Sequence, residues 1–481
     1  EPVRTPVASR NLYLACNPGA TEVPMSDRPQ NKQSWPRDVL VIVLALAAFG
    51  ILLTTAAAVL GVLPAMAQDG EGSQAFLPAI IRAANTPTPT QPATPTATPT
   101  STPGVPPVID DEYIVLGWND LGMHCYNRDF KDIAVLPPYN TLWAQVIKRG
   151  DPPQIITDTV TVDYSFPDNT YSVGKSNFWD FDVQLFGVDL PPNVGLTGNG
   201  MAGEMEAKGT HFAAEGIPLT EFSDSNPTQA DPYQLAEVVV TGPGGIQLAR
   251  STVVAPVSTE MHCDNCHKDG GVEGIRTGSV EQNILVLHDK ENADEYPNGH
   301  TGNLMDRRPI LCAECHASNA LGAPGVQGIP NLSKAMHKKH AGKVQNTTEG
   351  CYNCHPGPTT KCLRDVMSSE FNMGCTDCHG SMEQVAKNPN PWLNEPRCDN
   401  CHKDPKYAQN NPLFRMSTGH GGIYCEGCHD STHAIAPSSQ GRDAIKFVEL
   451  QGHGGPIDTC TVCHVTSPGG GSPHDVKTAA D

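Results

Sequence analysis

The sequence predicts a mixed fold, in which an N-terminal all-β, sandwich-like domain precedes a loop-rich domain made mostly of short helices. Two observations lead to this expectation. Short runs of β-branched and aromatic residues, separated by turn signals, recur through residues 110–257. Over residues 258–466 the pattern Cys-x-x-Cys-His recurs instead, among glycines and prolines that interrupt regular elements.

The β domain is expected to contain six strand-like runs. Pro-Pro and Asp-Asn turns separate the first four, and the last two flank Gly242-Pro-Gly-Gly245, which predicts a hairpin with a long turn. The expected strands cover residues 113–118, 141–148, 155–166, 178–186, 234–241 and 246–257.

The C-terminal region carries the pattern Cys-x-x-Cys-His seven times. Attachment of a c-type haem needs two thiols spaced to reach both vinyl groups of one porphyrin, and an imidazole beside the second thiol to bind the iron axially. The motifs therefore predict seven covalently attached haems. The copies are Cys263/Cys266/His267, Cys312/Cys315/His316, Cys351/Cys354/His355, Cys375/Cys378/His379, Cys398/Cys401/His402, Cys425/Cys428/His429 and Cys460/Cys463/His464.

Structural zinc is the main alternative, because zinc sites also use cysteines two residues apart. Zinc gives no reason for a histidine after every second cysteine, and ribbon sites join two cysteine pairs over a fixed gap, whereas the gaps here vary. Chance is a weaker alternative, since the frequencies of Cys and His predict on the order of 0.02 copies. Haem is favoured, with zinc or disulfides left open.

Haem would also supply an interior that the side chains provide only sparsely. Hydrophobic residues make up 38% of the chain, which contains 45 glycines and 43 prolines. A core of side chains alone would be thin in the C-terminal half, and seven flat apolar macrocycles would fill it. Each thioether pair would also shorten the loops of the unfolded chain, as a disulfide does.

The other histidines decide whether the haem irons are open. An iron with one histidine ligand can bind substrate, whereas two axial ligands close it and suit it to electron transfer. Bis-histidine ligation is expected throughout, with His262 as a reserve ligand and His474 in the tail. The predicted distal ligands are His288, His300, His337, His340, His420, His433 and His453.

Local sequence supports several of these ligands. Three of them, His300, His420 and His453, have glycine neighbours, which let the backbone approach a flat macrocycle. His337 and His340 lie on one helical turn and are expected to reach two adjacent haems. A methionine could replace one histidine, and the candidates are Met305, Met373 and Met382.

Apart from the fourteen motif cysteines and Cys16, two cysteines remain, Cys125 and Cys362. In an oxidising compartment they could pair and clamp the β domain to the haem domain, although pairing cannot be read from a sequence.

The β domain contains further patterns with a functional and a structural interpretation. His124, Cys125 and His211 could bind copper or zinc, or cap a haem, but histidines this far apart are more often structural. Residues 198–203 match G-x-G-x-x-G, yet no buried strand precedes them, so a glycine-rich loop is favoured. Three tryptophans are expected as core aromatics rather than electron relays: Trp118, Trp143 and Trp179.

The N-terminal part carries signals for export. A basic stretch precedes an uncharged run at residues 39–67, which is either a cleaved signal or a retained membrane anchor. The run of Pro, Thr and Ala that follows predicts an extended stalk. The expected division is an upstream segment (1–24), signal or anchor (25–67), stalk (68–109), β domain (110–257), haem domain (258–466) and flexible tail (467–481).

The formal net charge of −20, with no cluster of Lys and Arg, argues against nucleic acid as a partner.

The motif array resembles that of the multihaem c-type cytochromes that bacteria use for periplasmic and cell-surface electron transfer. The resemblance covers residues 261–465 and is specific for the cofactor, but less so for the role. Some members of this group conduct electrons to outside minerals, some assemble into filaments, and some reduce nitrogen or sulfur oxyanions. The nitrite-reducing members carry a C-x-x-C-K motif, which this sequence lacks.

The resemblance implies an exported, seven-haem electron conduit that is periplasmic, cell-surface or extracellular, and anchored to the cytoplasmic membrane if residues 39–67 are retained. Its expected partners are redox proteins or an extracellular electron acceptor, with self-assembly as a further expectation. Two alternatives stay open: an oxidoreductase acting on a small nitrogen or sulfur compound at an open haem face, and a filament subunit.

Overall fold

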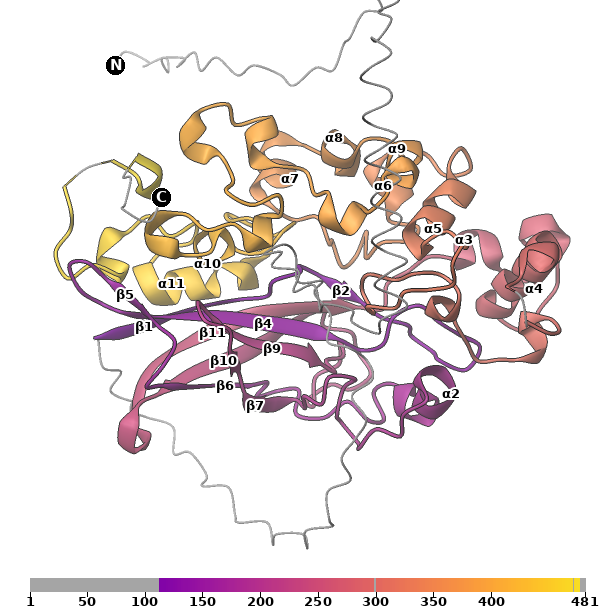
Figure 1. Ribbon diagram of the computed structural model, residues 1–481, viewed down its shortest axis with the longest axis horizontal. Coiled ribbons are helices and arrows are strands. Elements are labelled where there is room, and N and C mark those ends of the chain that lie inside the picture. The colour runs from indigo at the N-terminus through magenta and orange to yellow at the C-terminus, as the bar shows by residue number, and fades with distance from the viewer. Residues whose placement is uncertain (1–111, 298–299, 470, 476–481) are drawn as a thin grey trace, which may run out of the picture. The chain divides into compact units, whose positions relative to one another are not determined.

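The computed structural model describes residues 112–297, 300–469 and 471–475. The expected upstream segment, signal or anchor, and stalk lie outside these residues. Figure 1 shows the strands of the β domain together, with the short helices of the C-terminal region running along one side of them. The coarse prediction, a β-rich region followed by a loop-rich region of short helices, is confirmed.

Two five-stranded sheets form the β-rich region. In the first sheet the strand order is β1-β4-β9-β8, with β5 paired to β4, and every pairing is antiparallel. Its strands are β1 (Tyr113–Trp118), β4 (Asn140–Lys148), β5 (Gln154–Ile156), β8 (Glu206–Ala207) and β9 (Phe212–Ile217).

The second sheet has the order β2-β11-β10-β6-β7, and its centre is the long hairpin of β10 and β11 that the sequence predicts. Its strands are β2 (His124–Cys125), β6 (Thr161–Ser165), β7 (Ala202–Glu204), β10 (Tyr233–Thr241) and β11 (Gln247–Ser258). A short parallel pair joins β3 (Ile133–Ala134) to β12 (Ile310–Leu311), and so ties the β domain to the C-terminal region.

Burial along β4 explains why the two halves of the chain form one unit. Alternate residues of a strand face opposite sides of a sheet. Leu142 and Val146 enter the core shared by the two sheets, whereas Trp143 and Ile147 enter a second cluster that contains Tyr424 of the C-terminal region. The first sheet is therefore covered on both faces.

Polar contacts reinforce this second interface. The fully buried Gln145 side chain donates to Gly422 O at 3.2 Å and accepts from Tyr424 N at 3.0 Å. The buried Lys446 ammonium donates to Gly117 O at 3.1 Å. Because these groups are removed from water, each needs its partner across the interface.

One expected strand is wrong. Residues 178–186 form a 3-10 turn, η1 (Phe178–Asp180), and a short helix, α2 (Asp182–Phe186). Phe178, Phe181 and Leu185 recur at helical spacing, so the apolar period is near 3.6 rather than 2. The run expected at 155–166 is two strands, β5 and β6, because a turn interrupts it.

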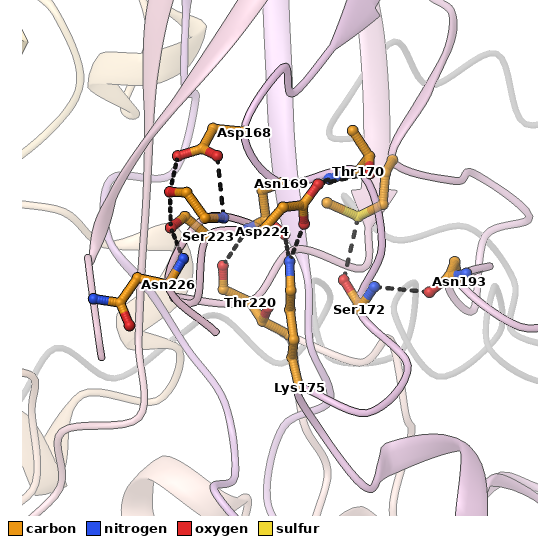
Figure 2. A network of polar contacts seen from close by, with 12 residues as sticks. Asp168, Asn169, Thr170, Ser172, Lys175, Asn193, Thr220, Ser223, Asp224 and Asn226 are labelled. Atoms are coloured by element: carbon orange, nitrogen blue, oxygen red, sulfur yellow. Dashed lines mark hydrogen bonds and ion pairs between the residues drawn. The ribbon is translucent and has the colours of Figure 1, made fainter. Parts of the chain in front are cut away.

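A polar network holds the loops at one end of the β domain (Figure 2). The Lys175 side chain is almost fully buried, and its ammonium contacts Asn169 Oδ1 at 2.8 Å and forms an ion pair with Asp224. Asn169 also donates to Thr220 O at 2.8 Å. Since each charge has an opposite charge or an amide beside it, the network stabilises loops rather than presenting a reactive group.

The C-terminal region is built from short helices joined by loops. The longest has 13 residues, and no helix within the described residues is both long and apolar enough to cross a membrane. The helices are α3 (Asp264–His267), α4 (Val280–Asn292), α5 (Leu332–His340), α6 (Thr348–Cys351), α7 (Val366–Phe371), α8 (Cys375–His379), α9 (Met382–Lys387), α10 (Cys425–His429) and α11 (Ile445–Gln451).

Candidate functional site

Each Cys-x-x-Cys-His motif lies in or beside a single helical turn. In the first motif the backbone N–H of His267 donates to Cys263 O at 2.8 Å, and the same bond spans the seventh motif, from His464 to Cys460, at 2.9 Å. Residues three and four apart share one face of such a turn. Both cysteines and the histidine of a motif therefore leave the backbone on the same side, as attachment to one planar group requires.

No disulfide joins any two of the motif cysteines, all of which lie within the described residues. Eleven of the fourteen are half-buried, but Cys266, Cys378 and Cys401 are exposed. These three thiols therefore mark motifs that lie at the surface of the protein chain. Each is the second cysteine of its motif, and the helical turns of these three motifs contain no buried residue, which places them on the surface of the loop-rich region.

Although Cys266 is exposed, it lies close to the third motif. Burial raises the pKa of Cys354, the second cysteine of the third motif, and the nearby Cys266 adds to the effect. The amide of Asn265, beside Cys266, donates to Asn353 Oδ1 at 2.6 Å. The first and third motifs are therefore in contact at the surface.

The structure brings a second imidazole opposite six of the seven motif histidines. Two imidazoles bound to opposite sides of one metal ion would have ring centroids about 6 Å apart, since each metal–nitrogen bond is about 2 Å. The observed centroid distances are 6.3 Å for His267 and His340, 6.2 Å for His316 and His288, 6.1 Å for His355 and His337, 6.1 Å for His379 and His433, 6.1 Å for His464 and His420, and 5.8 Å for His429 and His474.

Hydrogen bonds at Nδ1 leave the other ring nitrogen available for a metal in several of these pairs. His316 donates to Pro330 O at 2.7 Å, and in α5 His337 and His340 donate to carbonyl oxygens one turn earlier, at 2.8 and 2.7 Å. Such a bond fixes the tautomer and the ring orientation of a metal ligand. Within the described residues, Nε2 of these three rings has no protein partner.

An amide and a carboxylate contact Nδ1 of two motif histidines, and so also leave Nε2 of these rings available for a metal. Nδ1 of His267 lies 3.1 Å from Asn283 Oδ1. Nδ1 of His464 lies 3.2 Å from Asp151 Oδ1, which belongs to the β domain. A carboxylate in this position makes an imidazole a stronger electron donor to a metal. The β domain thus contributes directly to the seventh motif.

Burial keeps several of the paired imidazoles neutral, the form that binds a metal. It lowers the pKa of His355 and of His429 to about 4, and that of His433 to about 3. Smaller contributions to the low pKa of His433 come from the neighbouring His379 and Arg364.

Three histidines predicted as distal or reserve ligands are not brought opposite a motif histidine. His300 lies 3.1 Å from Gly302 O through Nε2 and 2.9 Å from Arg307 through Nδ1. Both ring nitrogens of His453 lie within hydrogen-bond distance of its own loop, and Nε2 of His262 lies 3.2 Å from Glu260. These local contacts occupy the nitrogens that iron would need.

His474 is the partner that the sequence did not indicate. It lies in the turn η14 (Pro473–Asp475), which an ion pair between Asp475 and Lys406 at 2.9 Å fastens to the loop after the fifth motif. The only signal in the sequence is the histidine itself, because its position depends on how the tail docks.

The seven motifs form a row whose order differs from that of the chain. Helix α5 carries the partners of the first and third motif histidines, three residues apart. Helix α4 carries His288, the partner of His316, and also Asn283, which contacts His267. The second, first and third motifs are therefore neighbours in that order.

Cysteines of different motifs that lie close to one another show which motifs come next in the row. Burial raises the pKa of Cys263 to about 11, and the nearby Cys354 adds to this effect. A contact with Cys375 of the fourth motif raises the pKa of Cys351 in the third motif. The third motif thus lies between the first and the fourth.

The fifth motif follows the fourth in the same way. Burial raises the pKa of Cys378, with smaller contributions that include Cys401 of the fifth motif. Burial also raises the pKa of Cys425 in the sixth motif to about 12, and Cys398 of the fifth contributes after it.

The seventh motif ends the row. Burial raises the pKa of Cys463 to about 12, with Cys428 of the sixth motif next in importance. The order in space is thus second, first, third, fourth, fifth, sixth and seventh. In Figure 1 the helices α3, α6, α8 and α10, which carry the first, third, fourth and sixth motifs, follow one another in this order.

The candidate metal ligands of the β domain do not come together. The His124 ring packs on Tyr139, with centroids 5.5 Å apart, whereas His211 stacks on Trp143 at 4.1 Å. Across the described residues, no three His, Cys, Asp or Glu side chains converge to hold a metal ion. A haem iron takes two axial ligands from the protein, which is the number of imidazoles that each pair supplies.

Cys125 and Cys362 are both free thiols. Cys125 is among the groups that raise the pKa of Cys362, after burial, so the two thiols are neighbours without being bonded. Cys362 Sγ lies 3.7 Å from Nδ1 of His433, the partner of the fourth motif histidine.

Two other predictions for the β domain can be compared with the structure. Trp118 and Trp143 are fully buried core aromatics, and Trp179 packs partly buried against the core. Residues 198–203 form a turn that leads into β7, with no helix after it, as expected for a glycine-rich loop.

No protein family, curated protein or solved structure matches this chain.

Proposed function

We propose that the chain is an exported c-type cytochrome with seven haems, and that its function is electron transfer between redox partners or to an extracellular acceptor. The observation that carries the proposal is the set of six imidazole pairs. Each pair includes a motif histidine, and its two rings have the separation that one iron requires.

Fourteen cysteines would hold the seven haems, and thirteen histidines would serve as axial ligands. When bound, a haem supplies one-electron exchange between ferric and ferrous iron. The cysteines are those of the seven motifs. The histidines are the seven motif residues and His288, His337, His340, His420, His433 and His474.

The chain itself contributes spacing, orientation and exclusion of water. The two ligands in α5 fix the distance between the first and third sites, because a helix is rigid over one turn. Carbonyl groups orient His337 and His340, and Asp151 orients His464. Burial lowers the pKa of His355 to about 4, which keeps that imidazole neutral. A single row of seven sites, with the second and seventh motifs at its ends, suits transport along the molecule better than reaction at one centre.

Export belongs to the same proposal. Attachment of c-type haem outside the cytoplasmic membrane is the general bacterial pattern for the cytochromes that this motif array resembles, and the uncharged run at residues 39–67 supplies a signal or an anchor. An acidic surface suits neither nucleic acid nor an anionic membrane as the partner.

Expression of the full chain in a bacterium with a haem-attachment system tests the proposal. The purified protein is expected to be red, with seven haems per chain in a pyridine haemochrome assay and a reduced α band that disappears on oxidation. Replacing Cys398 and Cys401 with alanine is the matched control, and it is expected to lower the count to six. A colourless wild-type protein from the exported fraction would sink the proposal.

A further inference from the structure

One motif histidine has no imidazole opposite it. All eighteen histidines of the chain lie within the described residues, so no partner can come from the remainder. His402 of the fifth motif has one ring in contact, that of Tyr407, at 5.8 Å between centroids and 67° between planes. The fifth site therefore differs from the other six in the residues it offers to the second face of a metal.

A second imidazole lies beside Tyr407, but it is paired with another motif. His474 lies beside Tyr407, with centroids 5.1 Å apart, but it is paired with His429 of the sixth motif. The ion pair between Asp475 and Lys406 holds the tail turn in this position. One tail histidine thus serves the sixth site and leaves the fifth without a ligand of its own.

The fifth site also faces solvent. Residues 401–408, which include His402 and the turn η9 (Pro405–Tyr407), are all exposed. The backbone of the first cysteine is held by the loop that follows the motif, since Cys398 N donates to Gln409 Oε1 at 2.6 Å. Small molecules can therefore reach this segment without passing through the protein.

We propose that the fifth site carries an open iron face that binds small ligands with a single lone-pair donor, such as carbon monoxide, nitric oxide or cyanide. This inference rests on the proposed haem function. An iron with one axial histidine binds such ligands, whereas an iron with two does not. The tail histidine closes the sixth site, and its removal is expected to open a second face.

Carbon monoxide titration of the reduced full-length protein, with ferric electron paramagnetic resonance alongside, tests the inference. Wild type is expected to bind one carbon monoxide per seven haems and to show one high-spin ferric signal. The variant His474→Ala is expected to bind two per chain. His453→Ala and His300→Ala are matched controls, because both histidines are occupied by local contacts, and each is expected to bind one.

The outcomes separate this inference from the proposed function. A haem count of seven with no carbon monoxide bound and only low-spin iron would overturn the open face and leave the cytochrome assignment intact. Tyr407→Phe is the second check, and a changed spectrum at the fifth site in that variant would identify Tyr407 as the ligand, which also contradicts the inference. An increase in carbon monoxide binding in either control variant would refute the imidazole pairing.

Discussion

Replacing the buried Asp120 with asparagine is expected to stabilise the protein at neutral pH and to flatten its pH dependence. Asp120 is fully buried at the end of the first strand, close to the sixth motif. Burial raises the pKa of its carboxyl to about 7, although Arg415 opposes the effect. The native state therefore binds the proton more tightly than the unfolded chain does.

The sign and size follow from proton linkage. A carboxyl with a raised folded-state pKa costs nothing below the unfolded pKa, near 4, and its penalty grows as the pH rises toward 7. A shift from 3.8 to about 7 corresponds to about 4 kcal/mol as an upper value, at about 1.4 kcal/mol per pKa unit. Asparagine keeps the shape without the charge, so Asp120→Asn should match wild type at pH 4 and exceed it at pH 8.

Denaturant unfolding followed by far-ultraviolet circular dichroism, at intervals from pH 4 to pH 8, measures the difference. Asp163→Asn is the matched control, because Asp163 lies exposed on β6 of the same domain, and its pH profile should follow wild type. The reasoning is refuted if Asp120→Asn keeps the wild-type slope between pH 4 and pH 7, or is less stable at pH 8. The same substitution should lower the pKa of Glu426, because burial and then the neighbouring Asp120 carboxyl raise that pKa.

Three further substitutions test the core, the interface and the seventh site. Arg364→Met should destabilise the protein by about 3–5 kcal/mol in denaturant unfolding, because it leaves the Asp443 carboxylate, now 2.7 Å from the guanidinium, buried without a counter-charge. Gln145→Leu should cost about 2–4 kcal/mol by the same assay, since it removes three hydrogen bonds at the buried interface. On the proposed function, Asp151→Asn should raise the reduction potential of the haem at the seventh motif in a spectroelectrochemical titration, because the amide would withdraw the electron density that the carboxylate lends to His464.

Exposed residues of the same type provide the controls. Arg442→Met removes a partly exposed ion pair with Asp231 and should cost less than about 1 kcal/mol. Gln154→Leu on β5 should leave the unfolding midpoint near wild type, and Asp158→Asn should leave all reduction potentials unchanged. Equal losses for a buried variant and its exposed control would contradict the assigned contacts, as would a fall in potential in Asp151→Asn.

The strands that the sequence predicts well are runs of β-branched and aromatic residues bounded by turn signals. The expected bounds of β1 match those observed, and the expected bounds of β10 and β11 agree within one residue at each end. The strand β9 was missed, since its sequence Phe-Ala-Ala-Glu-Gly-Ile has small residues with little strand preference. Its pairing with β4, far away in sequence, and with the short β8 makes it a strand.

For the candidate site, the residue spacing within each motif predicts the local helical turn. It does not predict which histidine lies opposite the motif histidine. Five of the seven predicted distal histidines lie opposite a motif histidine, because few histidines are available and helices such as α5 point two of them outward together. Glycine neighbours favour His300 and His453 as ligands, but the structure places neither ring opposite a motif histidine. Their loops turn the ring nitrogens back on the chain, which no sequence pattern revealed.

Spacing is equally silent about how deep each motif lies. The first motif has the same Cys-Asp-Asn-Cys-His sequence as the fifth, and both expose their second cysteine, Cys266 and Cys401. The sixth motif instead has Glu426 and Gly427 between its cysteines, both buried against the β domain. The burial of a motif depends on which turns dock on the first sheet, and that is set by contacts distant in sequence.

The position of His337 and His340 in α5 has a consequence for how the molecule responds to thermal motion. One turn of helix changes its length very little while loops fluctuate, since its rise is about 1.5 Å per residue and hydrogen bonds lock it. Two redox centres with ligands on the same helical turn would move together during such fluctuations. The distance between them would stay nearly constant while the rest of the loop-rich region fluctuates. The rate of electron transfer between the two centres would then vary little.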